Sequence, residues 1–169
     1  MDIIHDNAAD LSALNGKTVA VIGYGAQGRA QALCMRDSGV NVIIGVRPGK
    51  SFDAATQDGF QVMTVAEAAD KADIIHILLP DESHGSVYEA EIKPHLKAGK
   101  TLCCSHGFAY VFNTIVPPAD VDVIMVAPKG PGTEVRRVFE EGFGCPGLIA
   151  VHQNPSGKAR DVALAMAKA

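Results

Sequence analysis

Three glycines in a six-residue stretch, GYGAQG from Gly23 to Gly28, are the first residues whose spacing suggests chemistry. They directly follow the apolar run TVAVI and precede a segment with a helical apolar period. Between a strand and a helix, Gly23 would close a tight turn, Gly25 would let the backbone approach a pyrophosphate, and Gly28 would let the helix pack close to the strand. The spacing predicts a dinucleotide phosphate site, with an ordinary strand-to-helix turn as the alternative.

The next polar group follows the second apolar run, Asn41 to Val46. An NAD site typically carries an Asp or Glu there, about 20 residues after the glycines, to bind the ribose 2′-hydroxyl. This sequence instead offers Arg47, Lys50 and Ser51. Two cations and a hydroxyl suit a 2′-phosphate, so we expect NADP(H) rather than NAD(H). A solvated loop is the alternative.

Polar residues also follow the run that ends at Pro80, as Asp81, Glu82, Ser83 and His84. They could face the same cleft and contact the cofactor. They could equally start a helix, because Asp81 or Ser83 would make a sound N-cap and acidic residues suit a first helical turn. Both interpretations stay open, and one residue could do both.

Two further strand ends carry groups suited to catalysis. His106 follows the run Thr101 to Ser105, where an imidazole could meet a nicotinamide or a substrate and move a proton. Lys129 follows the run Val121 to Pro128 and could neutralise an anionic substrate. The alternatives are a loop histidine and a surface lysine. His76 lies inside an apolar run and is expected to be a hydrogen-bonded core residue.

The elements that must position these residues alternate along the chain. Six short apolar runs, at 18–23, 41–46, 72–80, 101–105, 121–128 and 147–153, are mostly apolar without alternation, which is typical of strands buried on both faces. Helical apolar faces occur between them, at 26–34 and 159–166. The order predicts an α/β fold of the Rossmann type, a doubly wound and mostly parallel sheet with helices on both faces, whose ligands bind at the carboxyl ends of the strands.

Composition excludes several classes of function. The 169 residues include 15 Lys and Arg against 19 Asp and Glu, a net charge of −4, so nucleic acid is not an expected partner. No apolar run approaches a membrane span and the first residues lack a signal-peptide pattern, so we expect a cytoplasmic protein. Four cysteines without metal-site spacing are expected to be small buried hydrophobes.

Taken together, these strand ends resemble ketol-acid reductoisomerase, also called acetohydroxy acid isomeroreductase. The segments that carry the resemblance are GYGAQG, MRDSGVNV, LLPDE, SHGF, VDVIMVAPKGPGTEVR and LIAVHQ, in family order over nearly the whole chain. The resemblance implies an NADPH-dependent, Mg²⁺-requiring enzyme of branched-chain amino-acid biosynthesis. Such an enzyme shifts an alkyl group in 2-acetolactate or 2-aceto-2-hydroxybutyrate and then reduces the resulting 2-keto acid.

The resemblance also implies site residues. The family's cofactor contacts correspond to Tyr24, Gly25, Ala26 and Gln27, to Arg47 and Ser51 with Lys50 beside them, to Pro80, Asp81, Glu82, Ser83 and His84, and to Gly132. The catalytic positions correspond to His106 and Lys129. One departure is Ala109, where the family usually has Asn.

The family's metal-binding carboxylates lie in a knotted helical domain that begins beyond residue 169. The chain 1–169 is therefore expected to be the NADP-binding domain, without a metal site, and to continue past its last helical pattern. Alone it is expected to bind cofactor without turning over substrate, and a homo-oligomer is possible. Another Rossmann reductase of a keto acid or imine, or a stand-alone NADP-binding regulatory module, remains the alternative.

Overall fold

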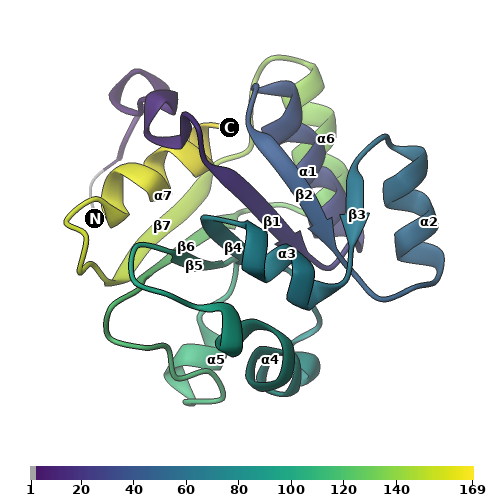
Figure 1. Cartoon of the computed structure of the whole chain (residues 1–169). Helices are drawn as coiled ribbons and strands as arrows, with labels where there is room; N and C mark the ends of the chain where they lie inside the picture. The colour runs from purple at the N-terminus through teal and green to yellow at the C-terminus, as the bar shows by residue number, and fades with distance from the viewer. Residues whose placement is uncertain (1–2) are drawn as a thin grey trace.

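A computed structural model describes residues 3–169 and contains one seven-stranded sheet (Figure 1). The strands are β1 (Thr18–Ile22), β2 (Asn41–Gly45), β3 (Gln61–Met63), β4 (Ile74–Ile77), β5 (Thr101–Cys104), β6 (Asp122–Pro128) and β7 (Gly147–Gln153). They lie in the order β3-β2-β1-β4-β5-β6-β7. Every pair from β3 to β6 is parallel, which confirms the predicted mostly parallel sheet.

Two strands differ from the expectation. The predicted runs omit β3, because three residues are too few to give a periodic signal. β7 is antiparallel to β6, and Gly147 pairs with Pro128. The chain returns to the carboxyl edge of β6 after the intervening helix, so the next strand has to run backwards. β7 is also not buried on both faces as its apolar run predicts, since it is an edge strand and Val151 is 40% exposed.

Helices cover both faces of the sheet (Figure 1). The α-helices are α1 (Ala26–Asp37), α2 (Lys50–Gln57), α3 (Val65–Lys71), α4 (Asp81–Val87), α5 (Phe108–Val111), α6 (Gly132–Glu140) and α7 (Ala159–Lys168). Short helical turns η1 (Asp6–Ala8), η2 (Leu11–Leu14), η3 (Tyr88–Ile92) and η4 (Lys93–His95) complete the chain. No helix within residues 3–169 is long and apolar enough to span a bilayer.

The core has two layers, one on each face of the sheet. Side chains of β1 alternate between them: Val19 and Val21 pack with α1 and α7, whereas Ala20 and Ile22 pack with α3, η3 and α5. The expected apolar face of α7 is buried: Ala159, Val162, Ala163 and Met166. The expected face of α1 is only partly buried, since Ala26 is exposed and Leu33 is half-buried. Ala30 and Cys34 of that face are buried against α6, and the side of α1 that packs on the sheet carries Ala32 and Met35 instead. α6 does not cover the sheet directly, because it packs on α1 through a small third cluster of Ala30, Cys34 and Val135.

The cysteines are free, and three of the four are buried as expected. Cys34, Cys103 and Cys104 lie in the core. Cys145 is only half-buried, because it lies in the turn between α6 and the edge strand β7 rather than in a strand. The prediction was wrong for this residue.

Candidate functional site

The sheet order reverses between β1 and β4, and the predicted site residues lie along the carboxyl edge around this point. The chain leaves β1 for α1 on one face and leaves β4 for α4 on the other (Figure 1). A crevice at such a reversal is where doubly wound sheets bind ligands, because the two crossovers diverge there.

The three glycines have three different surroundings. Gly23 has φ +100°, and a Cβ there would lie 2.7 Å from the backbone oxygen of Leu78. A Cβ on Gly28 would overlap the Gly23 carbonyl group, so only glycine lets α1 lie this close to the end of β1. Gly25 has no atom within 4 Å of its Cβ position. It is the N-cap of α1 and no side chain caps the helix, so an anion could bind its first-turn N–H groups without displacing a capping side chain.

The Tyr24 side chain packs against Phe60. It is buried, and its hydroxyl donates a 2.8 Å hydrogen bond to Asp58 at the end of α2. Arg29 binds the same carboxylate at 2.6 Å and 3.0 Å. Hydrogen bonding from Arg29 lowers the pKa of Asp58 to about 2, and burial raises the pKa of Tyr24. Asp58 therefore anchors the glycine-rich loop, a role that the sequence does not reveal because the two segments are 34 residues apart.

Arg47, Lys50 and Ser51 lie together after β2. Arg47 and Lys50 are exposed, and Ser51 is half-buried in the first turn of α2. Among residues 3–169, neither cation has a carboxylate within ion-pair distance. The pair of cations is thus available to an added anion at this end of the crevice.

A hollow of about 250 Å³ lies between the start of α1 and the ends of β4, β5 and β6. Its lining consists of Gln27, Ile77, Leu78, Leu79, Asp81, His84, Ser105, His106 and Pro128. The fold therefore brings together four of the predicted residues: Gln27, Asp81, His84 and His106. The apolar residues and Ser105 were not predicted as lining, because strand-interior and strand-terminal side chains look alike in an apolar run.

Neither Asp81 nor Ser83 caps α4. Pro80 occupies the N-cap position, and no side-chain hydrogen bond caps the helix. Asp81 faces the hollow, whereas Glu82 is exposed outside it. His84 is buried and donates from Nε2 to the Leu79 carbonyl at 2.8 Å, which fixes the loop between β4 and α4.

The two predicted catalytic residues are both exposed and lie on neighbouring strand ends. His106 accepts the Phe108 N–H at Nδ1 over 3.1 Å, so its neutral ring carries the proton on Nε2. Lys129 follows Pro128, a residue of the hollow, and its backbone N–H donates to Pro146 at 2.8 Å. The next carbonyl, that of Gly130, accepts the Gln27 amide at 2.8 Å.

Gly132 is buried where α6 meets α1. A Cβ on it would overlap the Ala26 carbonyl group and lie 2.9 Å from the backbone nitrogen of Gln27. Gly132 thus lets the two helix starts approach each other, as α1 and α6 do in Figure 1. Contact between this residue and the cofactor stays a prediction.

No group of three or more potential metal ligands occurs within residues 3–169. The acidic residues near α6 are already paired with arginines: Glu134 and Glu141 with Arg137, and Glu140 with Arg136. The described residues therefore do not fit a magnesium site.

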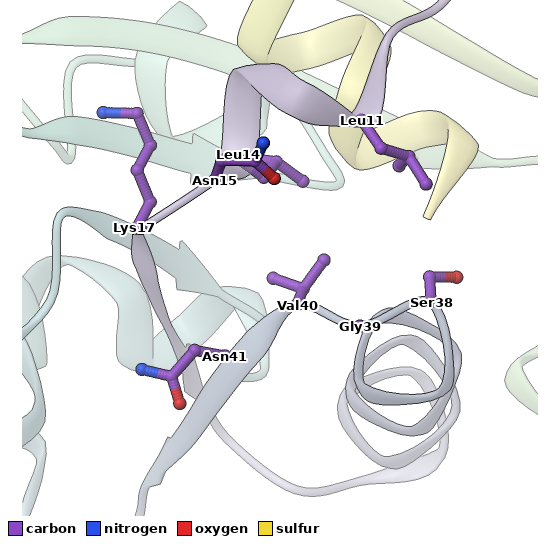
Figure 2. Close-up of a pocket in the computed structure, with 9 residues that line it drawn as sticks. Leu11, Leu14, Asn15, Lys17, Ser38, Gly39, Val40 and Asn41 are labelled. Carbon is purple, nitrogen blue, oxygen red and sulfur yellow. The ribbon is translucent and has the colours of Figure 1, made fainter.

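A second hollow, of about 220 Å³, lies at the opposite edge of the sheet. Figure 2 shows it between Leu11 and Leu14 of η2, Ser38 at the end of α1, and Val40 at the start of β2. It has no connection to the predicted site residues, because it faces the amino ends of β1 and β2.

Comparisons with known proteins agree with this arrangement. A family model described as acetohydroxy acid isomeroreductase, NADPH-binding domain, matches residues 13–169. A curated ketol-acid reductoisomerase (NADP(+)) from Akkermansia muciniphila is 98% identical over 169 residues, which are 100% of this chain and 52% of that protein. A ketol-acid reductoisomerase (NAD(+)) from the uncultured archaeon GZfos26G2 is 59% identical over 175 residues, covering 100% of this chain and 53% of that protein.

Among solved structures, an NADH-preferring ketol-acid reductoisomerase from an uncultured archaeon superposes with a TM-score of 0.96 at 60% identity. The match covers 99% of this chain and 53% of that one. A Plasmodium falciparum pyrroline carboxylate reductase with NADP bound shares the fold alone. It is 16% identical, with a TM-score of 0.68, and the match covers 92% of this chain and 55% of that one. The chain spans about half the length of the curated relatives it matches.

Proposed function

Because the chain belongs to the acetohydroxy acid isomeroreductase family as its NADPH-binding domain, we propose that it is the cofactor half of a ketol-acid reductoisomerase. The complete protein would convert 2-acetolactate or 2-aceto-2-hydroxybutyrate to the 2,3-dihydroxy acid. The observation that supports this most directly is the open space in front of Gly25, at the uncapped start of a helix beside the hollow that His106 lines. Family membership favours this activity over that of an imine reductase or another keto-acid reductase.

The proposed cofactor position follows the crevice. The pyrophosphate would bind the N–H groups after Gly25, since they are unpaired and carry the positive end of the helix dipole. The adenosine end would reach Arg47, Lys50 and Ser51, whose charges suit a 2′-phosphate. The nicotinamide end would enter the hollow, near the Asp81 to His84 segment and His106.

The residues of this chain would then orient and neutralise rather than form bonds. NADPH supplies the hydride for the reduction. His106 would donate a hydrogen bond from Nε2, because Nδ1 is occupied by the Phe108 N–H. Lys129 would offset the negative charge of a substrate carboxylate or of an oxygen at the end of β6. The Mg²⁺ ligands of the complete protein would lie in the part of the relatives that residues 1–169 do not cover, about half of their length.

The first test measures the binding of NADPH and of NADH to the purified chain by calorimetry. Wild type should bind NADPH more tightly than NADH. Arg47→Ala combined with Lys50→Ala should weaken NADPH binding by about a hundredfold or more, because two charge-assisted contacts are lost at roughly 1.5–3 kcal/mol each, and should leave NADH binding unchanged. Asp53→Asn, on the exposed face of α2, is the control. Equal losses for the two cofactors would contradict the assignment of the 2′-phosphate site.

The second test is NADPH oxidation with 2-acetolactate and Mg²⁺. The full-length protein should be active and the 169-residue chain inactive. Turnover by the chain alone would refute the half-enzyme proposal. An inactive full-length protein that still binds NADPH would favour the alternative of a regulatory module.

We also propose that the isolated chain self-associates in the cytoplasm through the side chains around α5. Phe108, Val111, Phe112 and Val116 are 42%, 73%, 64% and 59% exposed. Exposed apolar side chains this close together favour association. Sedimentation showing a monomer at high concentration would count against this.

A further inference from the structure

A continuous set of side-chain hydrogen bonds lies beneath the hollow, and we call it the amide chain: His76, Gln31, Gln27 and Ser105. His76 Nε2 lies 2.8 Å from Gln31 Oε1, and Gln31 Nε2 lies 3.0 Å from Gln27 Oε1 and 3.3 Å from Ser105 Oγ. Gln27 Nε2 then donates to the Gly130 carbonyl at 2.8 Å, and Ser105 Oγ donates to the Val126 carbonyl at 2.7 Å. Four elements, α1, β4, β5 and β6, are joined in this way.

The donor and the acceptor of each bond in the amide chain are fixed by the backbone carbonyls that the chain contacts. The Gly130 carbonyl can only accept, so Gln27 must present its amide nitrogen there and its oxygen to Gln31. Gln31 must therefore donate to Gln27, which leaves its oxygen facing His76. His76 must then donate from Nε2. The amide chain thus selects one ring tautomer in the core.

His76 is an unusual residue for its position. It is fully buried in the centre of β4, between isoleucines. Burial lowers the pKa of His76 to about 4, so the ring is neutral at pH 7. Its Nδ1 has no hydrogen-bond partner among the described residues. An apolar side chain here would avoid the unpaired Nδ1 but would leave Gln31 Oε1 without its partner, so the hydrogen bond to Gln31, and not packing alone, accounts for an imidazole at this position.

The amide chain branches at Gln31, and two of its branches, through Gln27 and through Ser105, reach the loops that carry the proposed reacting groups. Gly130 follows Lys129, and Ser105 precedes His106. The middle of the chain lies on α1, whose first turn is the proposed pyrophosphate site. Movement of Gln31 would therefore change the position of both loops relative to the bound cofactor, without touching the cofactor itself.

We propose that Gln31 is a positioning residue: through Gln27 and Ser105 it holds the Lys129 loop and the His106 strand end in register with the cofactor-binding helix. This inference rests on the proposed reductoisomerase function. It concerns the geometry between the two sides of the crevice, and not the affinity for NADPH.

The test uses the full-length protein with three variants. Gln31→Met keeps the side-chain length but breaks the amide chain and leaves His76 unpaired. Gln31→Met combined with His76→Met removes both partners of the buried His76–Gln31 bond, which is nearly neutral for stability when the replacement fills the same space. Gln27 Oε1 also loses its donor, but Gln27 is half-buried and lines the hollow, where water can replace that bond. Ser38→Ala removes a 2.9 Å hydrogen bond to the Ala169 carbonyl at the far end of α1 and is the matched control.

We expect Gln31→Met to lower the melting temperature and to lower kcat by about tenfold, within the range that small misplacements of reacting groups cause. The KM for NADPH should stay within about twofold of wild type, because the first-turn N–H groups are unchanged. The double variant should regain its melting temperature but not its kcat. If kcat recovers together with stability, or if Gln31→Met has the kcat of wild type, the proposal is overturned.

A second readout does not depend on activity. In the 169-residue chain, ¹⁵N NMR should show His76 as the Nε2–H tautomer without titration between about pH 5 and 8. Gln31→Met should move the amide signals of Gly130 and His106, whereas Ser38→Ala should leave them in place. An inactive wild-type full-length protein would refute the proposed function, while unmoved Gly130 and His106 signals would refute the positioning role.

Discussion

Replacing Gly132 by alanine should separate the start of α6 from the start of α1. The new Cβ would overlap the Ala26 carbonyl group and lie 2.9 Å from the Gln27 nitrogen. All of these are backbone atoms of a helical turn, so no flexible side chain can move aside. One helix must shift by on the order of 1 Å before the contact reaches the ~3.5 Å separation of non-bonded carbons.

The cost has two parts. Overpacking of this kind typically destabilises by about 1–3 kcal/mol. The shift would also stretch the hydrogen bond from Gln27 to the Gly130 carbonyl, now 2.8 Å, worth about 1 kcal/mol. A loss of roughly 2–4 kcal/mol is a large share of the 5–15 kcal/mol of a typical domain and should lower the melting temperature by on the order of 10 °C.

Gly130→Ala is the matched control, two residues earlier in the same loop. Its Cβ would meet only the Cys145 sulfur at 3.2 Å and the Glu134 Cβ at 3.8 Å, so we expect a loss below about 1 kcal/mol. Urea unfolding followed by circular dichroism measures both variants. If Gly132→Ala unfolds with the same midpoint as Gly130→Ala, the close approach of the two helix starts does not contribute to stability, and the reasoning fails.

Three further outcomes are expected. Asp58→Asn should lower the free energy of unfolding at pH 7 by about 1 kcal/mol, a small value because Arg29 is mostly exposed. The difference from wild type should shrink as pH falls from about 4 to 2, because the Asp58 carboxylate of wild type is protonated there too. A difference that stays constant in acid titrations would contradict this. Thr64→Ala removes the capping box with Glu67 and should cost about 1 kcal/mol without changing NADPH affinity, as paired unfolding and calorimetry would show. Of the four thiols, Cys145 should react first with a disulfide reagent, and fast labelling of a second thiol in the native protein would count against the buried core.

Much of the fold could be predicted from the sequence, because doubly buried strands and one-sided helices leave strong patterns. Apart from Thr18, Asn41 and His76, the central strands β1, β2 and β4 are made of buried apolar residues, and α7 buries each residue of its predicted face. The direction of β7 could not be predicted. It depends on α6 packing against α1 instead of against the sheet, a tertiary choice that has no local signature.

The candidate site was likewise only partly predictable from the sequence. Gly23 and Gly28 could be assigned, because their roles are local to one strand-to-helix turn. Asp58 could not, because its partners lie in other elements. The same holds for the amide chain, in which an ordinary-looking glutamine on α1 meets a histidine 45 residues away. Hydrogen-bond networks between distant segments cannot be predicted from the periodicity of apolar residues, because this pattern indicates only which side of an element is apolar.

Because of the strand order, the two ends of the crevice are encoded by separate stretches of the gene. The strands on the β2 side of the sheet, whose ends carry Arg47 and Lys50, are encoded before β4. The strands on the other side, whose ends carry His106 and Lys129, are encoded after β4. Under the proposed assignment of these residues, exchanging a short early stretch of codons would change the cofactor preference, while the later stretch, which encodes the proposed reacting residues, stays as it is.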